Sequence, residues 1–168
     1  AGPGAGAGTR PAAGAAARTD FGASAENLRR ARLCVDRLRA MPEVDPKRIA
    51  AYGHSMGGFV TIGLAASATN LLAAAAITGS GIAPQDGYPA PSANAAERIR
   101  TPFLMLHGAE DPVVRPAQSE ALKEVLDRNR VPNERKVLAG EGHNIDREHQ
   151  AEVLDAIRAW FTRHGVLE

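Results

Sequence analysis

Residues 51–60 read AYGHSMGGFV, and Ser55 stands there between glycines at positions 53 and 57. A short apolar run precedes the serine, and the pattern after it is typical of a helix. A serine that only had to cap a helix would need no glycine on either side. The spacing therefore predicts a serine held on a sharp turn between a strand and a helix, with Gly53 and Gly57 leaving room for the backbone. Gly58 is expected to let the following helix pack closely.

The composition bounds the class of protein. The chain has 168 residues, 44% apolar and 23% charged, which suffices for one globular domain with a core. A net charge of +1 gives no electrostatic argument for nucleic acid or for an anionic membrane as a partner. No apolar run approaches the ~20 residues that span a bilayer. Cys34 is the only cysteine, which excludes an intrachain disulfide and a CxxC site and leaves the compartment open between cytoplasmic and secreted.

Two segments are expected along the chain. Fifteen of the first twenty residues are Ala, Gly or Pro, and we expect residues 1–23 to form a flexible segment because they offer little side chain to bury. Residues 24–168 are expected to form the domain. It opens with an amphipathic helix at 24–41, capped by Ser24, and Cys34 lies on the apolar stripe of that helix, which predicts a core position.

Strands and helices are predicted to alternate along the domain. Four apolar stretches predict strands, at residues 49–52, 71–78, 102–108 and 135–140. Further helices are expected at 57–67, from Pro116 onward, and around 153–161. This alternation predicts an α/β class with a predominantly parallel sheet of about four strands flanked by helices. In such sheets functional residues gather at the carboxyl ends of the strands.

Three polar residues fall at those ends. Ser55 follows the first predicted strand, Asp111 the third and His143 the fourth. A serine hydroxyl is a weak nucleophile until an adjacent base takes its proton, and an acid is needed to orient that base. The order Ser, Asp, His along the chain is the one found around a G-x-S-x-G turn. These residues are therefore the candidate nucleophile, orienting acid and base.

Other assignments compete with this one. Asp111 could be a turn aspartate with Glu110 as the acid, and His143 could be a solvent-exposed histidine in a glycine-rich turn. His54 and His107 flank strand ends, where we expect them to support the site through hydrogen bonds rather than to contact substrate. No group of histidines and acids has the spacing of metal ligands, so we expect no metal and no cofactor.

Three motifs carry a resemblance to a known family. GHSMGG, LMLHGAEDPVV and GEGHNI resemble the nucleophile, acid and histidine motifs of the α/β-hydrolase superfamily, over about residues 24–163. The sequence is most similar to the dienelactone hydrolase-like and acetyl esterase-like branch, beside the prolyl oligopeptidase catalytic domains. The resemblance implies Ser55 as nucleophile, His143 as general base and Asp111 as its orienting acid. It also implies that the N–H of Met56 is one oxyanion donor.

The chain departs from the family pattern before the first predicted helix. The family has several strands there, and a loop among them gives the second oxyanion N–H. The resemblance therefore implies the C-terminal portion of an α/β-hydrolase fold, whose first strand presents an edge for a partner or a second copy to cover. The loop at 81–94 is too short for a lid domain, which favours an open site.

The function predicted from these features is a serine hydrolase that cleaves small or exposed carboxylic esters through an acyl-enzyme. One alternative is a serine peptidase of prolyl oligopeptidase type. Another is a truncated domain that is catalytically silent or is completed by a partner.

Overall fold

The computed structural model describes residues 22–68, 70–84 and 89–168. The predicted flexible segment, residues 1–23, lies almost wholly outside the described residues. The described chain has one sheet, in which the order β1–β2–β3–β4 follows the sequence and all neighbours are parallel. Its strands are β1 (Ala50–His54), β2 (Ala74–Thr78), β3 (Phe103–Gly108) and β4 (Asn133–Leu138).

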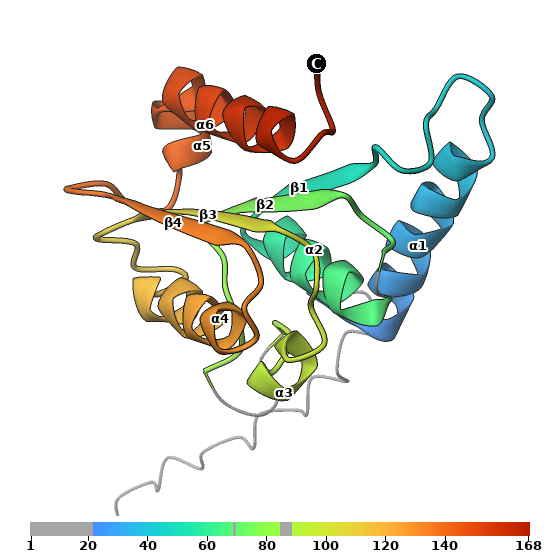
Figure 1. Ribbon diagram of the computed structural model, residues 1–168. Coiled ribbons are helices and arrows are strands. Elements are labelled where there is room, and N and C mark those ends of the chain that lie inside the picture. The colour runs from blue at the N-terminus through green and yellow to red at the C-terminus, as the bar shows by residue number, and fades with distance from the viewer. Residues whose placement is uncertain (1–21, 69, 85–88) are drawn as a thin grey trace, which may run out of the picture.

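Helices cover both faces of this sheet (Figure 1). The helices α2 (Met56–Ser67), α3 (Ala93–Ala96) and α4 (Pro116–Arg128) lie on one side, with α1 (Ala25–Arg39) packed outside α2. The helices α5 (Ile145–Glu148) and α6 (Gln150–Arg163) lie on the other side. In the described part of the chain, no helix has the length and apolar character needed to cross a membrane. The predicted α/β class with a parallel four-stranded sheet is therefore confirmed.

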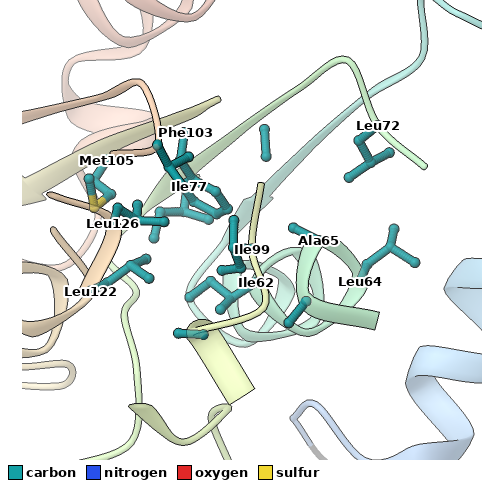
Figure 2. Packing of buried hydrophobic residues seen from close by; sticks show 14 of the residues in the cluster. Ile62, Leu64, Ala65, Leu72, Ile77, Ile99, Phe103, Met105, Leu122 and Leu126 are labelled. Atoms are coloured by element: carbon teal, nitrogen blue, oxygen red, sulfur yellow. The ribbon is translucent and has the colours of Figure 1, made fainter. Parts of the chain in front are cut away.

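The core is divided between the two faces because successive strand residues point to opposite sides. Ile77, Phe103 and Met105 face α2 and α4, where Ile62 and Leu122 are fully buried (Figure 2). The intervening strand residues pack on the other face with Ile145 and α6; these are Ala74, Ala76, Leu104 and Leu106. The two middle strands, β2 and β3, are buried on both faces. Their sequences are therefore continuous apolar runs without alternating polar residues.

The predicted strand boundaries shift in the structure. The strand predicted at 49–52 runs from Ala50 to His54, and the one predicted at 102–108 begins at Phe103. The strand predicted at 71–78 begins at Ala74, and Leu71 and Leu72 are buried ahead of it, in the connection from α2. The strand predicted at 135–140 runs from Asn133 to Leu138. It stops there because Gly140 has a φ of 76°, which no strand residue adopts.

The prediction that Cys34 is a core residue is wrong. Cys34 is exposed, as are Leu38 and Met41 of the same apolar stripe, while Val35 is buried. Helix α1 packs against α2, and this helix–helix contact covers only a narrow seam around Val35. Adjacent helix residues point about 100° apart, which carries Cys34 out of that seam.

The strand β1 is one edge of the described sheet. It pairs with β2, and no described strand pairs along its other side. Tyr52 at the middle of β1 is 42% exposed. An unpaired parallel strand leaves backbone N–H and C=O groups available to another chain segment.

Candidate active site

Ser55 occupies a strained turn between β1 and α2. Its φ is 51° and its ψ is −119°, a conformation that residues other than glycine rarely adopt. The turn is held by hydrogen bonds from the Ser55 N–H to the Thr78 carbonyl, at 2.9 Å, and from the Gly58 N–H to the Ser55 carbonyl, also at 2.9 Å. The predicted strand–turn–helix setting of Ser55 is therefore present.

The glycines around Ser55 have different roles. A β-carbon on Gly53 would overlap the backbone of Gly57, and one on Gly58 would overlap the side chain of Ser80. A β-carbon on Gly57 would meet nothing within 4 Å. The prediction that Gly57 leaves room for the turn is thus wrong in detail, because only Gly53 and Gly58 are required by close approach.

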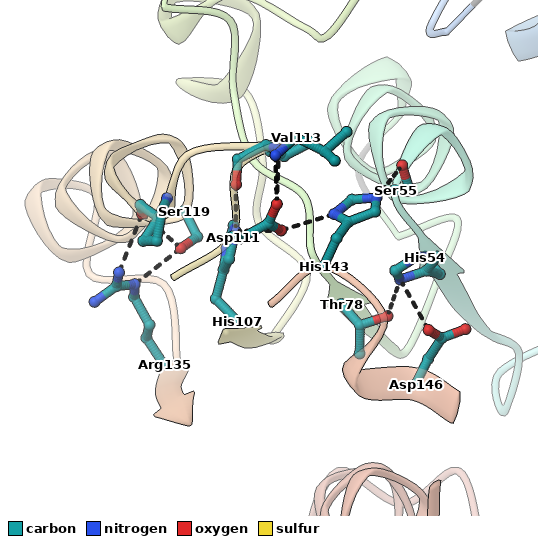
Figure 3. A network of polar contacts seen from close by, with 12 residues as sticks. His54, Ser55, Thr78, His107, Asp111, Val113, Ser119, Arg135, His143 and Asp146 are labelled. Carbon is teal, nitrogen blue, oxygen red and sulfur yellow. Dashed lines mark hydrogen bonds and ion pairs between the residues drawn. The ribbon is translucent and has the colours of Figure 1, made fainter. Parts of the chain in front are cut away.

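Ser55, His143 and Asp111 form a continuous hydrogen-bonded series (Figure 3). The His143 Nε2 atom lies 2.9 Å from the Ser55 Oγ, and its Nδ1 atom lies 2.7 Å from the Asp111 Oδ2. A carboxylate can only accept, so the proton sits on Nδ1 and the Nε2 lone pair receives the serine hydroxyl. The structure thus brings together three residues that come from three different strand ends.

Asp111 is surrounded by donors. Its side chain is fully buried, and its Oδ1 accepts the Val113 N–H at 2.8 Å and the Val114 N–H at 2.9 Å. Burial alone would raise the pKa of Asp111, but the hydrogen bonds from His143, Val114 and Val113 together lower that pKa below its usual value. The carboxylate therefore stays ionised beside the imidazole. Glu110, the rival acid, is exposed.

His107 supports the loop that carries Asp111. Its Nε2 lies 2.8 Å from the Val114 carbonyl, which fixes the proton on that nitrogen because a carbonyl only accepts. The same nitrogen is 3.3 Å from the Asp111 Oδ2. The side chain is fully buried, and burial lowers the pKa of His107, so the ring stays neutral. The prediction that His107 is a hydrogen-bonding support is confirmed.

His54 is the second supporting histidine. Its Nδ1 lies 3.0 Å from the Thr78 Oγ1 and 3.6 Å from the Asp146 Oδ1. Its ring centroid lies 4.8 Å from that of His143. The prediction that His54 makes supporting hydrogen bonds is confirmed, although sequence reasoning did not identify Thr78 or Asp146 as its partners.

Met56 is the first residue of α2 and follows Ser55 directly. The first N–H groups of a helix have no partner within that helix, and the helix dipole makes this end positive. The placement suits the Met56 N–H for an oxyanion that develops at Ser55. Within the described residues, no group of three or more His, Cys, Asp or Glu side chains could hold a metal ion.

An open cavity of about 480 Å³ lies beside the loop that follows Asp111. Among the described residues that line it, Arg115 is the only charged one and most of the others are apolar. The described lining is Ile82, Ala83, Pro84, Pro112, Val113, Arg115, Ala117, Gln118 and Ala121. The cavity thus joins the ends of β2 and β3 to the first turns of α4.

The sequence profile of the Dienelactone hydrolase family matches residues 6–162 of this chain. The chain belongs to the dienelactone hydrolase family. The uncharacterized protein Rv2307c of Mycobacterium tuberculosis is 30% identical to this family member over an alignment of 151 residues, which covers 82% of this chain and 53% of the relative. The chain thus spans about half the length of that relative.

Solved structures share the fold of this dienelactone hydrolase family member. A puromycin-hydrolyzing peptidase of Mycobacterium tuberculosis superposes with a TM-score of 0.74 at 24% identity, over 84% of this chain and 26% of the peptidase. Dipeptidyl peptidase 4 of Porphyromonas gingivalis superposes with a TM-score of 0.73 at 17% identity, over 86% of this chain and 24% of the peptidase. The protein SOBER1 of Arabidopsis thaliana superposes with a TM-score of 0.67 at 23% identity, over 83% of this chain and 63% of SOBER1. The α/β-hydrolase fold implied by the sequence motifs is therefore confirmed, and the chain is a member of a hydrolase family.

Proposed function

We propose that this chain is a serine esterase that cleaves small or exposed carboxylic esters through an acyl-enzyme. The observation that carries the proposal is the hydrogen-bonded series from Ser55 through His143 to Asp111. In this proposal Ser55 is the nucleophile, His143 the general base and Asp111 the acid that orients it.

The first half of the reaction forms the acyl-enzyme. The Ser55 Oγ attacks the ester carbonyl carbon while its proton passes to the His143 Nε2, which lies 2.9 Å away. Asp111 holds the Nδ1 proton and stabilises the imidazolium that forms. The tetrahedral intermediate then collapses, and the Nε2 proton goes to the departing alkoxide oxygen. The products are the alcohol and an ester of Ser55.

The second half repeats these steps with water. His143 takes a proton from a water molecule, the resulting hydroxide attacks the Ser55 ester, and the proton returns to the serine oxygen as the acid leaves. In both halves the carbonyl oxygen becomes an anion near the Met56 N–H. Each preorganised donor of this kind is worth about 10²–10³ in rate in enzymes where it has been tested.

The cavity beside the loop that follows Asp111 supports the proposed substrate class. Its volume of about 480 Å³ and its largely apolar lining suit a small acyl or alcohol group. Ser55 is half-buried and the next residue, Met56, is exposed, which leaves the nucleophile accessible to an ester on the surface of a larger molecule.

The direct test uses p-nitrophenyl esters of increasing acyl length and a fluorophosphonate probe. The wild-type chain should hydrolyse the short esters and be labelled by the probe, whereas Ser55→Ala should do neither. Equal ester hydrolysis and equal labelling in the two proteins would contradict the proposal. Identifying the labelled peptide by mass spectrometry should place the adduct on Ser55.

A serine peptidase of prolyl oligopeptidase type uses the same three side chains. The fold is shared with solved peptidases, including one described as puromycin-hydrolyzing, at identities below 25%. An aminoacyl-p-nitroanilide separates the two functions. Cleavage of this amide with no cleavage of the p-nitrophenyl esters would favour the peptidase.

A domain that a partner completes is the third candidate, and the unpaired side of β1 favours it. A second copy or another protein that pairs along β1 would cover Tyr52 and could add an oxyanion donor. In that case ester hydrolysis per chain should rise with protein concentration or on addition of the partner. An activity independent of concentration, together with a monomeric mass, would favour a chain that works alone.

A further inference from the structure

We propose that His54 is a positioning residue that, together with Thr78 and Asp146, holds the His143 ring in the orientation in which it reaches Ser55. We call His54, Thr78 and Asp146 the His54 latch. The inference rests on the proposed function, because it assigns the latch to the catalytic imidazole.

The register of the sheet creates one half of the latch. The last residues of β1 and β2, His54 and Thr78, are direct partners in the parallel pairing. Their side chains meet, with the His54 Nδ1 3.0 Å from the Thr78 Oγ1. Tyr52 lies on the same face, two residues earlier, and its hydroxyl is 3.1 Å from the same Thr78 oxygen. The His54 ring is thus fixed to the sheet rather than to a loop.

The other half reaches the segment that carries His143. Asp146 is in α5, three residues after His143, and its Oδ1 lies 3.6 Å from the His54 Nδ1. This oxygen is buried and accepts no hydrogen bond from the described residues. The negative charge of Asp146 favours the tautomer in which His54 Nδ1 carries the proton. His54 therefore links the end of β1 to α5.

The two imidazole rings are in contact (Figure 3). Their centroids are 4.8 Å apart, with 49° between the ring planes. Both rings lie against Gly79, where a β-carbon would come within 3.2 Å of the His143 Nδ1 and 3.2 Å of the His54 Cε1. Gly79 has a φ of 51° and leaves this space to the two rings. A ring at position 54 therefore limits how far His143 can turn away from Ser55.

Burial of His54 keeps a second positive charge away from His143. Burial lowers the pKa of His54, and the neighbouring His143 and Arg147 lower it further, while Asp146 and Asp111 raise it. Tyr52 also faces the site, and burial raises its pKa, so its hydroxyl stays neutral. A neutral His54 adds no repulsion when His143 takes up the serine proton. The Asp146 carboxylate adds negative charge on the same side.

Three substitutions separate these contributions. His54→Phe keeps a ring against His143 and removes the contacts to Thr78 and Asp146. His54→Asn keeps a polar group near the Nδ1 position and removes the ring. Asp146→Asn keeps the shape and removes the charge. His164→Gln is the control, because His164 packs on Trp160 in the last turns of the chain.

The measurements are kcat and KM for p-nitrophenyl acetate, the rate of fluorophosphonate labelling, and the melting temperature. We expect His54→Phe to lower kcat and the labelling rate roughly 10- to 100-fold with KM unchanged, because misplacement of a catalytic group acts on the chemical step. His54→Asn should lose at least as much activity as His54→Phe, because it also removes the ring that limits how far His143 can turn. Asp146→Asn should lower kcat by less than His54→Phe, because the ring at position 54 stays while the charge that faces its Nδ1 atom is lost. His164→Gln should match the wild type.

Two results would overturn the inference while the proposed function stands. One is a Ser55-dependent activity that His54→Phe leaves unchanged. The other is a loss of kcat in His54→Phe that disappears when rates are divided by the folded fraction. A wild-type chain with no Ser55-dependent reaction would refute the proposed function instead.

The low-field proton resonance of the His143 Nδ1–H bond to Asp111 then tests the latch without activity. It should be sharp in the wild type and broadened in His54→Phe, and identical spectra would refute the latch.

Discussion

Gly58 lies so close to Ser80 that a β-carbon at position 58 would overlap the Ser80 Cβ and Oγ atoms. This contact joins the first turn of α2 to the segment that follows β2. It therefore fixes the helix whose first N–H groups face the Ser55 turn.

Gly58→Ala should destabilise the fold because the new methyl group has no space. Overpacking of this kind typically costs about 1–3 kcal/mol. Gly57→Ala is the matched control, since a β-carbon there meets nothing within 4 Å and alanine is the better helix former. The measurement is the free energy of unfolding in urea. Equal stability of the two variants would show that the α2–Ser80 contact is looser than the structure has it.

Asp111→Asn should abolish most of the activity without unfolding the protein. An amide at this position can donate to the His143 Nδ1, which moves the ring proton to Nε2 and leaves no lone pair for Ser55. In a well-studied serine protease the equivalent change costs about 10⁴ in kcat. Glu110→Gln is the control, because Glu110 is exposed beside Asp111. The assay is the rate of fluorophosphonate labelling, and a larger loss in Glu110→Gln would transfer the role of the acid to Glu110.

His107 should make the stability of the protein depend on pH. Burial lowers the pKa of His107 in the folded state below its ordinary value of 6.5, so the unfolded chain binds a proton that the folded chain does not. The contribution of His107 to the free energy of unfolding is therefore full above pH 6.5 and is lost as the pH falls below it.

The measurement is urea unfolding at pH 7.5 and pH 5.5 in the wild type and in His107→Gln. Glutamine keeps an N–H donor for the Val114 carbonyl but does not titrate. We expect the wild type to lose up to about 1 kcal/mol more than the variant between these pH values. The same loss in both proteins would mean that His107 is protonated in the folded state.

The sequence predicted the parts of the site that depend on local patterns. The strand, the glycines and the helix around Ser55 lie within a dozen residues, and the order of Ser55, Asp111 and His143 follows from three separate motifs. The His54 latch could not be predicted in the same way. Its contacts depend on the register that pairs His54 with Thr78 and on the short helix that carries Asp146.

The difference between a local sequence pattern and a contact set by the fold also explains why Cys34 of α1 was wrongly predicted to be a core residue. Hydrophobic periodicity shows which residues of a helix share a face, and it does not show how much of that face a neighbour covers. Val35 is buried against α2, whereas Leu38 and Cys34 extend beyond the contact. The start of β2 at Ala74 was misplaced for a related reason, because the apolar residues Leu71 and Leu72 belong to a buried connection ahead of the strand.

The cavity beside Asp111 should set the limit on acyl length. Ala121→Phe would place a ring among lining residues that are now mostly small or apolar. We expect little change with p-nitrophenyl acetate and a clear loss of kcat/KM with p-nitrophenyl octanoate, because only the longer chain needs the space. Glu124→Phe adds the same side chain to an exposed position of α4 outside the cavity lining and serves as the control. Parallel losses for both esters in Ala121→Phe would place the acyl group elsewhere.

The exposed position of Cys34 gives a direct chemical test of how α1 packs. A free thiol on the outer flank of a helix should react with Ellman's reagent under native conditions, and the chain holds one cysteine, so the expected yield is one thiol per chain. Adding urea should leave that yield unchanged. Cys34→Ser should show no reaction and should keep the wild-type free energy of unfolding, since the side chain fills no part of the core. A thiol that reacts only after unfolding would mean that another surface covers this flank of α1, and the partner-completed candidate would then gain support over the chain acting alone.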